Sequence, residues 1–428
     1  MLEWSDVDIA VRDAVREFVD KEIRPHVDAL ESGEMEPYPI IRKLFATFGI
    51  ADMARDSLNK RLARLRDGHG AATDKPSSGG MFGGDGGSAG MGFVVVSELC
   101  RVSMGVVTGM GVSLGLTVPT IMGRGTLAQQ ERWLPDLVTY DKVGAWAITE
   151  PDSGSDAFGG MKSYVVRDGD DYILNGQKTF ITNGPDADVV VVYAKLNEND
   201  AGSGSSRERS STSNQRDRKV LTFVLDRGMD GFVQSKPFRK MGIHSSRTGE
   251  LFFNDVRLGR DRLLGETEGD SADGKDSGRD SARSNFSAER IGVAAMALGV
   301  IEECLRLCVD YAKTRTLWGR EIGQFQLIQL KLANMEVARM NVRNMLFRVI
   351  EAAQTGTAIS LAQASAIKWY CSQAATDVAM EAVQVFGGNG YMTEYRVEQL
   401  ARDAKSLMIY AGSNEVQITH VARGLLSD

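Results

Sequence analysis

Apolar residues recur at helical spacing through the first third of the chain. From Val7 to about Arg66 they fall three or four positions apart, which predicts several amphipathic helices in succession. The same spacing returns over residues 93–107 and 127–137. The segment 67–92 that interrupts it is so rich in Gly, Ser and Asp that it can bury almost no apolar surface, and we expect a long flexible loop there.

The period of the pattern changes near Gly144. Residues 187–196, 219–228 and 249–258 are rich in β-branched and aromatic side chains, as is typical of strands. An Asn-Gly pair at 175–176 lies between two further strand-like runs and predicts a hairpin. The polar insert 197–219 is expected to be a solvated loop between strands. The middle of the chain is therefore predicted to be a β domain.

Helical spacing returns after a low-complexity segment, residues 266–285, that we interpret as a linker or mobile loop. Three helices longer than twenty residues and one shorter helix are predicted, at 290–315, 327–356, 361–388 and 413–426. Such a set can form an antiparallel bundle. The expected fold class is α+β, with a helical domain (1–144), a β domain (145–265), the linker (266–285) and a helical bundle (286–428).

Composition narrows the class of protein. The 428 residues are 43% hydrophobic and 25% charged, which is ordinary for a soluble globular protein of two or three domains. A net charge of −7 argues against nucleic acid or an anionic membrane as the main partner. The N-terminus lacks the basic and apolar regions of a signal peptide, and no run approaches about eighteen consecutive apolar residues. We expect a cytoplasmic protein without a membrane span.

Metal and nucleophilic-serine sites find little support. Cys304 and Cys308 lie one helical turn apart, but no other Cys or His stands at ligand spacing, so small apolar residues in a helix are the favoured interpretation. The few cysteines form no disulfide framework, which suits a reducing compartment. Ser153 and Ser155 lack the strand-turn-helix elbow of a serine nucleophile. The histidines are scattered, at His26, His69, His244 and His420. We predict no metal site.

Three loops carry residues suited to a polar cofactor. Residues 145–163 are rich in small hydrogen-bonding side chains, although an ordinary turn would look the same. Residues 315–326 contain arginine, which can pair with a pyrophosphate, and glutamine, which can bond a heterocycle edge. The Gly-Gly-Asn-Gly of residues 384–395 permits close backbone approach or a helix C-cap. No strand precedes it, so it is not a dinucleotide-binding βαβ fingerprint.

Together and in this order, these segments resemble the acyl-CoA dehydrogenase family. The resemblance runs from about Val7 to Leu426 outside the three loops. It is carried by AITEPDSGSD (147–156), YILNGQKTFITNG (172–184), ERIGVAAMALG (289–299), RTLWGREIGQFQ (315–326), VQVFGGNGYMTE (383–394) and RDAKSLMIYAGSNEVQ (402–417).

The resemblance implies a fold and an activity. Family members have an N-terminal helical domain, a middle β-barrel-like domain and a C-terminal four-helix bundle, the same order as the periodicity predicts. They hold FAD non-covalently, remove the α proton of an acyl-CoA thioester and pass the β hydrogen to the flavin as hydride. Electrons then go to an electron-transfer flavoprotein. The implied context is fatty acid β-oxidation, and the implied assembly is a homotetramer, or dimer of dimers, with FAD spanning a subunit interface.

The resemblance also assigns cofactor positions, and each carries a compatible residue. The flavin loops are expected to contain Ala147, Ile148, Thr149, Ser155, Phe180, Ile181 and Thr182, with Ser155 also near the pantetheine. The segment that meets FAD from the neighbouring subunit is expected to contain Arg315, Thr316, Phe325, Gln326, Gln384, Gly387 and Gly388. Ser413 and Asn414 match the turn that closes the cofactor site.

The catalytic base departs from the common pattern. Many members have a glutamate at the position of Ala411, which cannot accept a proton. Isovaleryl-CoA and long-chain types place the base on the first bundle helix instead, and Glu289 falls at that position. By itself a glutamate in a first helical turn needs no further role, since the exposed N–H groups favour it by about 0.3–1 kcal/mol. The absent carboxylate at 411 and the present one at 289 are complementary, so Glu289 is the predicted base.

The rest of the substrate site follows from the same resemblance. The α proton of a thioester is a poor acid, so the enolate oxygen needs hydrogen-bond donors and the base benefits from an apolar setting. Ala411 keeps the backbone N–H that serves this purpose in the family. Arg290 matches a CoA-contacting arginine, and Gly412 lies against the acyl chain. Glu394 and Glu415 are weaker candidates for the base.

Two other functions remain open at the level of sequence. A non-catalytic FAD-binding relative or scaffold subunit would carry flavin that no acyl-CoA reduces. An acyl-CoA oxidase would pass electrons to oxygen. The small Ala411 favours a branched or bulky acyl group, while the insert at 67–92 replaces a segment that often helps to wall the acyl cavity, so chain length is not predicted.

Overall fold

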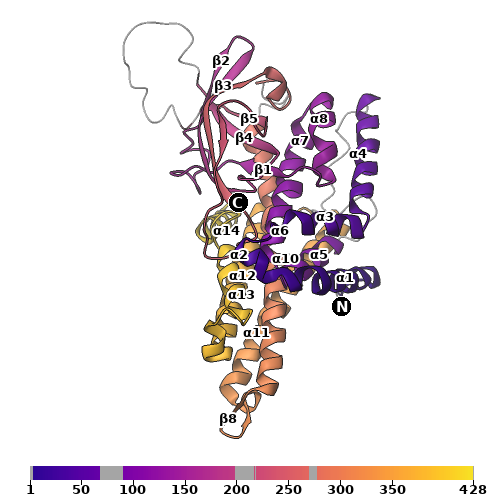
Figure 1. The fold of residues 1–428 in the computed structure, drawn as a ribbon, viewed down its shortest axis with the longest axis vertical. Coiled ribbons are helices and arrows are strands. Elements are labelled where there is room, and N and C mark those ends of the chain that lie inside the picture. Colours follow the sequence, from indigo (N-terminus) through magenta and orange to yellow (C-terminus); the bar gives the residue numbers. More distant parts are fainter. Residues whose placement is uncertain (1–2, 68–89, 198–215, 217, 269–276, 428) are drawn as a thin grey trace.

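The chain folds into helices at both ends of the sequence and a β-sheet between them (Figure 1). The computed structural model describes residues 3–67, 90–197, 216, 218–268 and 277–427, and of residues 277–285 only the backbone. The expected loops at 67–92 and 197–219 lie almost entirely outside these residues. The predicted α+β fold class is confirmed, whereas the domain boundaries remain a prediction.

The N-terminal part is helical, as predicted. A capping box begins α1: the Ser5 hydroxyl accepts from the Asp8 N–H and the Asp8 carboxylate accepts from the Ser5 N–H at 3.1 Å. The elements are α1 (Asp6–Phe18), η1 (Val19–Ile23), η2 (Arg24–His26), α2 (Val27–Ser32), α3 (Tyr38–Thr47), α4 (Ile50–Arg66), α5 (Met91–Cys100), α6 (Met104–Val112), η3 (Ser113–Thr117), α7 (Val118–Arg124) and α8 (Leu127–Val138).

One described helical stretch, Met104–Arg124, is long and apolar enough to cross a membrane by length and composition alone. Glycines and hydroxyl residues interrupt the apolar run of this stretch, so the pattern of unbroken apolar residues does not predict it. Most of it is buried inside the protein, where Val106, Met110 and Ile121 are fully enclosed. Burial of this kind is what the central helix of a globular core requires.

Seven strands form the middle sheet, in the order β1-β4-β2-β3-β7-β6 with β5 beside β4. Strands β1 and β2 pair with β4 in parallel and the other pairs are antiparallel. The predicted runs at 187–196, 219–228 and 249–258 correspond to β4, β5 and β7. The strands are β1 (Gly144–Ala147), β2 (Tyr164–Asp168), β3 (Asp171–Thr182), β4 (Val189–Leu196), β5 (Val220–Asp226), β6 (Phe232–Gln234) and β7 (Thr248–Leu258).

The hairpin predicted at Asn175–Gly176 is wrong. These residues lie inside β3, and the chain reverses instead between Asp168 and Asp171, which pair at the ends of β2 and β3. Gly176 has φ 141°, and its pairing with β7 shifts at this point. A Cβ atom there would come within 2.4 Å of the Ser163 hydroxyl. Glycine therefore marks a bulge with close backbone approach rather than a turn.

Long helices build the C-terminal part. As predicted, three of them exceed twenty residues: α10 (Ser277–Thr314), α11 (Gln326–Gln354) and α12 (Leu361–Phe386). The shorter elements are β8 (Thr316–Leu317), β9 (Arg320–Glu321), η4 (Arg260–Arg262), η5 (Ile322–Gln324), η6 (Gly387–Tyr391), α13 (Val397–Ser406) and α14 (Asn414–Leu426). All four cysteines are buried and unpaired.

The linker predicted at 266–285 is partly wrong, because α10 already begins at Ser277. Adding a turn to an existing helix fixes few dihedral angles per hydrogen bond gained, so a polar segment can extend a strongly apolar helix. Residues 269–276 of the same segment lie outside the described part of the chain. As a result α10 runs from beside the sheet to the far end of the bundle (Figure 1).

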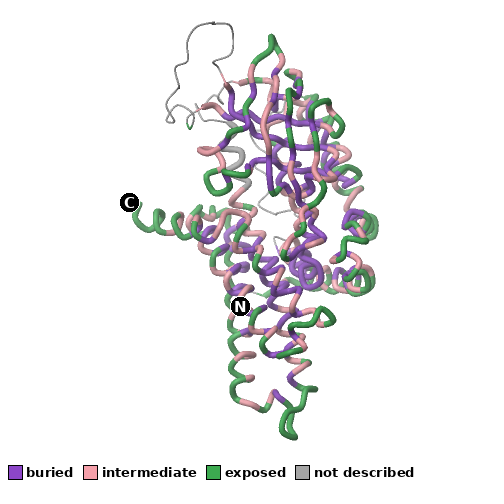
Figure 2. The backbone as a smooth tube through the Cα atoms, turned by 60° about the vertical axis from the view of Figure 1, so that its left-hand side comes forward, coloured by how far each residue is buried: buried purple, intermediate pink, exposed green. Residues whose placement is uncertain are grey.

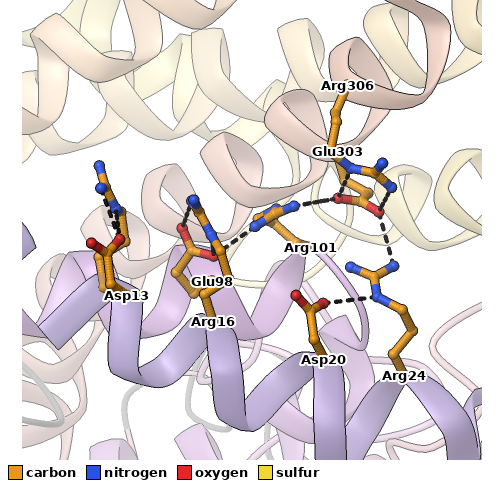
Figure 3. A network of polar contacts seen from close by, with 9 residues as sticks. Asp13, Arg16, Asp20, Arg24, Glu98, Arg101, Glu303 and Arg306 are labelled. Atoms are coloured by element: carbon orange, nitrogen blue, oxygen red, sulfur yellow. Dashed lines mark hydrogen bonds and ion pairs between the residues drawn. The ribbon is translucent and has the colours of Figure 1, made fainter. Parts of the chain in front are cut away.

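A chain of ion pairs joins the N-terminal helices to α10 (Figure 3). Glu303, on α10, is fully buried and accepts from three arginines. Arg101, which directly follows α5, bridges Glu303 and Glu98 at 2.9 and 2.8 Å. The outer members are Arg16, which pairs with Glu98 at 2.7 Å, Arg24, which pairs with Glu303 at 3.0 Å, and Arg306, which pairs with Glu303 at 2.7 Å.

Candidate active site

A tight turn precedes α14, and its backbone is left-handed at two consecutive residues. Ala411 has φ 56° and Gly412 has φ 80°. Alanine is uncommon in this conformation, and strained backbone of this kind concentrates at functional sites. The Gln417 side chain of α14 donates to the carbonyls of Ala411 at 3.1 Å and Gly412 at 2.8 Å. Within the described part of the chain the Ala411 N–H has no acceptor, so it is available to a ligand.

Glu289 lies on α10 in a partly buried position. Burial raises the pKa of its carboxyl group to about 7, against the opposing charges of Arg290 and Lys368. A carboxylate that titrates near neutral pH is suited to take up a proton. Both alternative carboxylates are exposed. At Glu415, hydrogen bonds from its own N–H and from Ser413 lower the pKa, which makes it a poor base.

Arg290 is 5% exposed, and the structure gives its Nε and Nη1 atoms no hydrogen-bond partner among the described residues. Burial lowers the pKa of this guanidinium, although Glu289 acts in the opposite direction. A buried charged group without partners is costly, so these donors point to a ligand or to water at this position. Tyr410 directly precedes Ala411 of the turn, and burial raises the pKa of its hydroxyl group.

The flavin-loop residues predicted from the β domain lie together at the ends of β1 and β3. The loop after β1 pairs with β3, since the Thr179 N–H donates to the Thr149 carbonyl at 2.9 Å and the Thr149 hydroxyl donates back at 2.6 Å. Phe180 has φ 59° and is 68% exposed, with its ring against Phe238. Ala147, Ile148 and Ile181 are buried beneath, Thr182 is partly buried, and Ser155 is exposed in the following turn.

This edge of the sheet adjoins α10. Phe286, one turn before Glu289, meets Trp146 of β1 edge-on with ring centroids 5.9 Å apart. Asn183, which follows β3, donates to the carbonyls of Gly109 in α6 and Gly144 in β1, at 2.8 and 2.9 Å. The flavin loops, the predicted base and α6 are therefore neighbours in one chain.

A buried ion pair that the sequence did not suggest supports the loop after β1. Lys178 is fully buried and donates to the Glu150 carboxylate at 2.8 Å and to the Ile148 carbonyl at 3.1 Å. Glu150 also accepts from the N–H groups of Lys162 and Ser163. Its partners lie 12 to 28 residues away, so no local pattern could have identified it.

Two further predicted cofactor residues, Ser413 and Asn414, lie where the turn enters α14. Most of the others gather in a separate cleft of about 820 Å³, which is lined by Arg315, Phe325, Gln326, Gly387 and Gly388. Thr316 lies in β8 beside it, and the Gln384 carbonyl accepts from the Gly387 N–H. Gly387 also ends α12 at φ 61°, so its C-cap role is real. In addition, the guanidinium of Arg320 stacks over the Phe325 ring, 4.1 Å from its centroid.

This cleft lies at the end of the bundle remote from the sheet, where β8 is labelled in Figure 1. The predicted flavin-loop residues therefore lie where the sheet meets α6 and α10, whereas the cleft belongs to the largely exposed far end of the bundle (Figure 2). One chain does not bring these two groups together.

Comparison with known proteins decides the family. Three family models match consecutive parts of the chain: acyl-CoA dehydrogenase N-terminal domain (residues 80–141), middle domain (145–256) and C-terminal domain (276–426). The chain is 32% identical to an acyl-CoA dehydrogenase of Bacillus subtilis, over 98% of this chain and 97% of the relative. This chain belongs to the acyl-CoA dehydrogenase family.

Other members of the acyl-CoA dehydrogenase family are similarly close. Isovaleryl-CoA dehydrogenase of Pongo abelii is 34% identical over 80% of this chain and 76% of that protein. The solved structure of butyryl-CoA dehydrogenase from Megasphaera elsdenii superimposes with a TM-score of 0.81 at 31% identity, covering 100% of both chains. The family is one of flavoprotein oxidoreductases, which confirms the resemblance, whereas the roles of individual residues remain predictions.

Proposed function

We propose that this chain is an FAD-dependent acyl-CoA dehydrogenase in which Glu289 is the base. The observation that carries the proposal concerns Lys368, which donates to the Gly412 carbonyl of the left-handed turn and whose charge also acts on Glu289. Burial raises the pKa of Glu289 to about 7, and the Ala411 N–H of the same turn has no acceptor among the described residues. Glu289 takes the α proton of the thioester, and the Ala411 N–H donates to the developing enolate oxygen. FAD, when bound at this site, would supply the acceptor for the hydride that leaves the β carbon.

The surrounding residues suit this chemistry. The buried donors of Arg290 can bind a polar or anionic part of the substrate, and Gly412 leaves room for the acyl chain. Ser155, exposed after β1, can reach the pantetheine. The small side chain of Ala411 supports a branched or bulky acyl group as substrate. A scaffold protein would have no need for a glutamate whose pKa is raised to about 7 at this position. The raised pKa therefore favours the enzyme over that alternative.

The residues present fit FAD only if two chains cooperate. The exposed ring of Phe180 and the hydroxyls of Thr149 and Thr182 can meet the flavin at the edge of the sheet. Arg315 and Arg320 can neutralise a pyrophosphate in the cleft at the far end of the bundle. We propose that a second copy supplies this cleft and that Ser413 and Asn414 close the cofactor site.

Exposed apolar side chains support such an assembly. Leu327, Leu330, Val337 and Met340 lie on one face of α11 and are 51–74% exposed. We propose that this face contacts another copy in a homotetramer, and that an electron-transfer flavoprotein accepts the electrons. A cytoplasmic location remains a prediction.

Anaerobic titration with acyl-CoA tests the activity directly. Straight and branched acyl-CoAs of four to sixteen carbons are added to the purified holoprotein while the flavin absorption band is followed. At least one should bleach the band, and a branched substrate should do so at the lowest concentration. If none bleaches it, the scaffold alternative gains support. Rapid hydrogen peroxide production on admission of oxygen would instead indicate an oxidase.

Arg315→Ala should weaken FAD binding roughly ten- to a hundredfold, because a charge-assisted hydrogen bond contributes about 1.5–3 kcal/mol. The measurement is titration of the flavin-free protein with FAD, followed by flavin fluorescence. Arg12→Ala is the matched control, since the exposed Asp13 is the one ion-pair partner of Arg12 among the described residues. Equal FAD affinity of the Arg315 variant and the parent would show that the cleft does not bind the cofactor.

A further inference from the structure

Lys368, on α12, is an unusual component of the turn region. Its side chain is fully buried, yet no carboxylate lies within ion-pair distance among the described residues. Nζ donates instead to two neutral acceptors, the Gly412 carbonyl at 2.8 Å and the Asn414 Oδ1 at 3.0 Å. Burial lowers the pKa of this amine to about 8. Burying an ammonium group without an ion pair is unfavourable, so its retention calls for a functional reason.

The hydrogen bonds of Lys368 fix the backbone next to the predicted enolate donor. The Gly412 carbonyl accepts from both Lys368 and Gln417, each at 2.8 Å. Asn414, the first residue of α14, accepts from Lys368 and from the Ser372 hydroxyl, each at 3.0 Å. The amine thus ties the carbonyl side of the turn to the start of α14, which immobilises the peptide groups that follow the Ala411 N–H.

The charge of Lys368 also acts on the base. Glu289 and Lys368 attract each other, and this attraction holds the pKa of Glu289 below the value that burial alone would give. The other charged groups that act on Lys368 are Arg290 of α10, which opposes its protonation, and Glu415 of α14, which favours it. Burial lowers the pKa of His420 of α14, and the charge of Arg290 acts in the same direction.

We propose that Lys368 is a positioning residue for the dehydrogenation, which holds the Ala411–Gly412 turn in place and favours the ionised form of Glu289. This proposal rests on the proposed function, because it assigns Lys368 a role toward the base and the enolate donor of that reaction. It predicts that substitutions can separate two effects of Lys368: its hydrogen bonds to the turn and to Asn414, called the tether below, and the effect of its charge on Glu289.

The test is the pH profile of flavin reduction, measured by anaerobic stopped flow between pH 5.5 and 9 with the best acyl-CoA. The parent rate should rise with pH as Glu289 loses its proton near pH 7, and it should level off only above about pH 8, where Lys368 also loses its charge. Lys368→Met should lower the plateau about tenfold and move the midpoint up by about one pH unit, since a nearby positive charge is lost. Lys368→Gln serves the same purpose if the Met variant does not fold.

Two matched variants separate charge from tether. Lys368→Arg keeps the charge, so its midpoint should stay at the parent value even if its plateau falls. Ser372→Ala removes another donor to Asn414 without changing a charge, so it should lower the plateau a few-fold with an unchanged midpoint. Suppose that Lys368→Met and Lys368→Gln lower the rate but leave the midpoint of the pH profile at the parent value. The proposed effect of the Lys368 charge on Glu289 would then be refuted.

The proposal can be tested even if no acyl-CoA reduces the parent flavin, an outcome that would overturn the proposed function instead. The pKa of Glu289 is higher in the folded protein than in the unfolded chain, so ionisation of its carboxyl group lowers the stability of the fold. The stability of the parent relative to Glu289→Gln should therefore decline as pH rises above about 4.5 and become constant above about 7. In the Lys368→Met background this decline should extend to higher pH. Identical curves in both backgrounds would refute the electrostatic role.

Discussion

Glu289→Gln should reduce the rate of flavin reduction by acyl-CoA by a factor of about 10²–10⁴, while FAD stays bound. Glutamine nearly preserves the shape of the side chain but cannot take up the α proton. Because burial raises the pKa of Glu289 to about 7, the parent rate should fall as pH drops below 7 and the carboxyl group becomes protonated. The small residual rate of the variant should lack this pH dependence.

Glu415→Gln is the control for this prediction. Glu415 belongs to the same turn region, but it is exposed and its pKa is lowered, so its replacement should leave the reduction rate within about twofold of the parent. A Glu289 variant that keeps its flavin and is reduced as fast as the parent would refute the base assignment. Loss of activity in Glu415→Gln alone would move the base to α14.

Glu303→Gln should destabilise the fold by about 3 kcal/mol at pH 7, the largest stability effect expected of a single isosteric substitution here. Glu303 is fully buried between three arginines, and these lower its pKa to about 2 despite burial (Figure 3). The neutral amide would leave the buried Arg101 with Glu98 as its one carboxylate partner among the described residues. Urea unfolding of parent and variant measures the difference.

The same ion pairs predict how acid acts on the fold. The folded pKa of Glu303 lies below its unfolded value near 4.5, so its stabilisation is complete above about pH 4.5 and is lost as pH falls toward 2. The stability gap between parent and variant should therefore close over this range. Asp13→Asn breaks an exposed pair with Arg12 and should change stability by less than about 1 kcal/mol. A gap independent of pH would contradict the low pKa.

Features with a local cause were predictable from the sequence. The helices from Asp6 to Arg66 and the strands β4, β5 and β7 follow from apolar period, which depends only on near neighbours. The prediction from Asn175–Gly176 failed because glycine is also used where two backbones approach closely, and here Gly176 meets Ser163, which directly precedes β2. Sequence pattern alone does not distinguish the two uses of glycine.

Features that depend on distant parts of the chain were not predictable. The ion pair between Arg24 and Glu303 spans 279 residues, and Lys368 meets the turn across 44 positions, so neither leaves a local signal. Glu289 was predicted only through the family resemblance, and its dehydrated setting became evident from the packing of α10. Likewise, the cofactor residues could be named from the sequence, but the distance between the flavin loops beside α6 and the cleft at the far end of the bundle could not be predicted.

The length of α10 has a consequence for the assembly. Glu289 stands near the sheet end of this helix, and Arg315 follows directly after its other end, 26 residues later. At 1.5 Å per residue the two are roughly 40 Å apart along a continuous helix. If each chain gives its base to one cofactor site and its arginine to the next, the length of this helix sets how far apart those two sites lie in the assembly. An insertion or deletion within α10 would therefore disturb two sites at once.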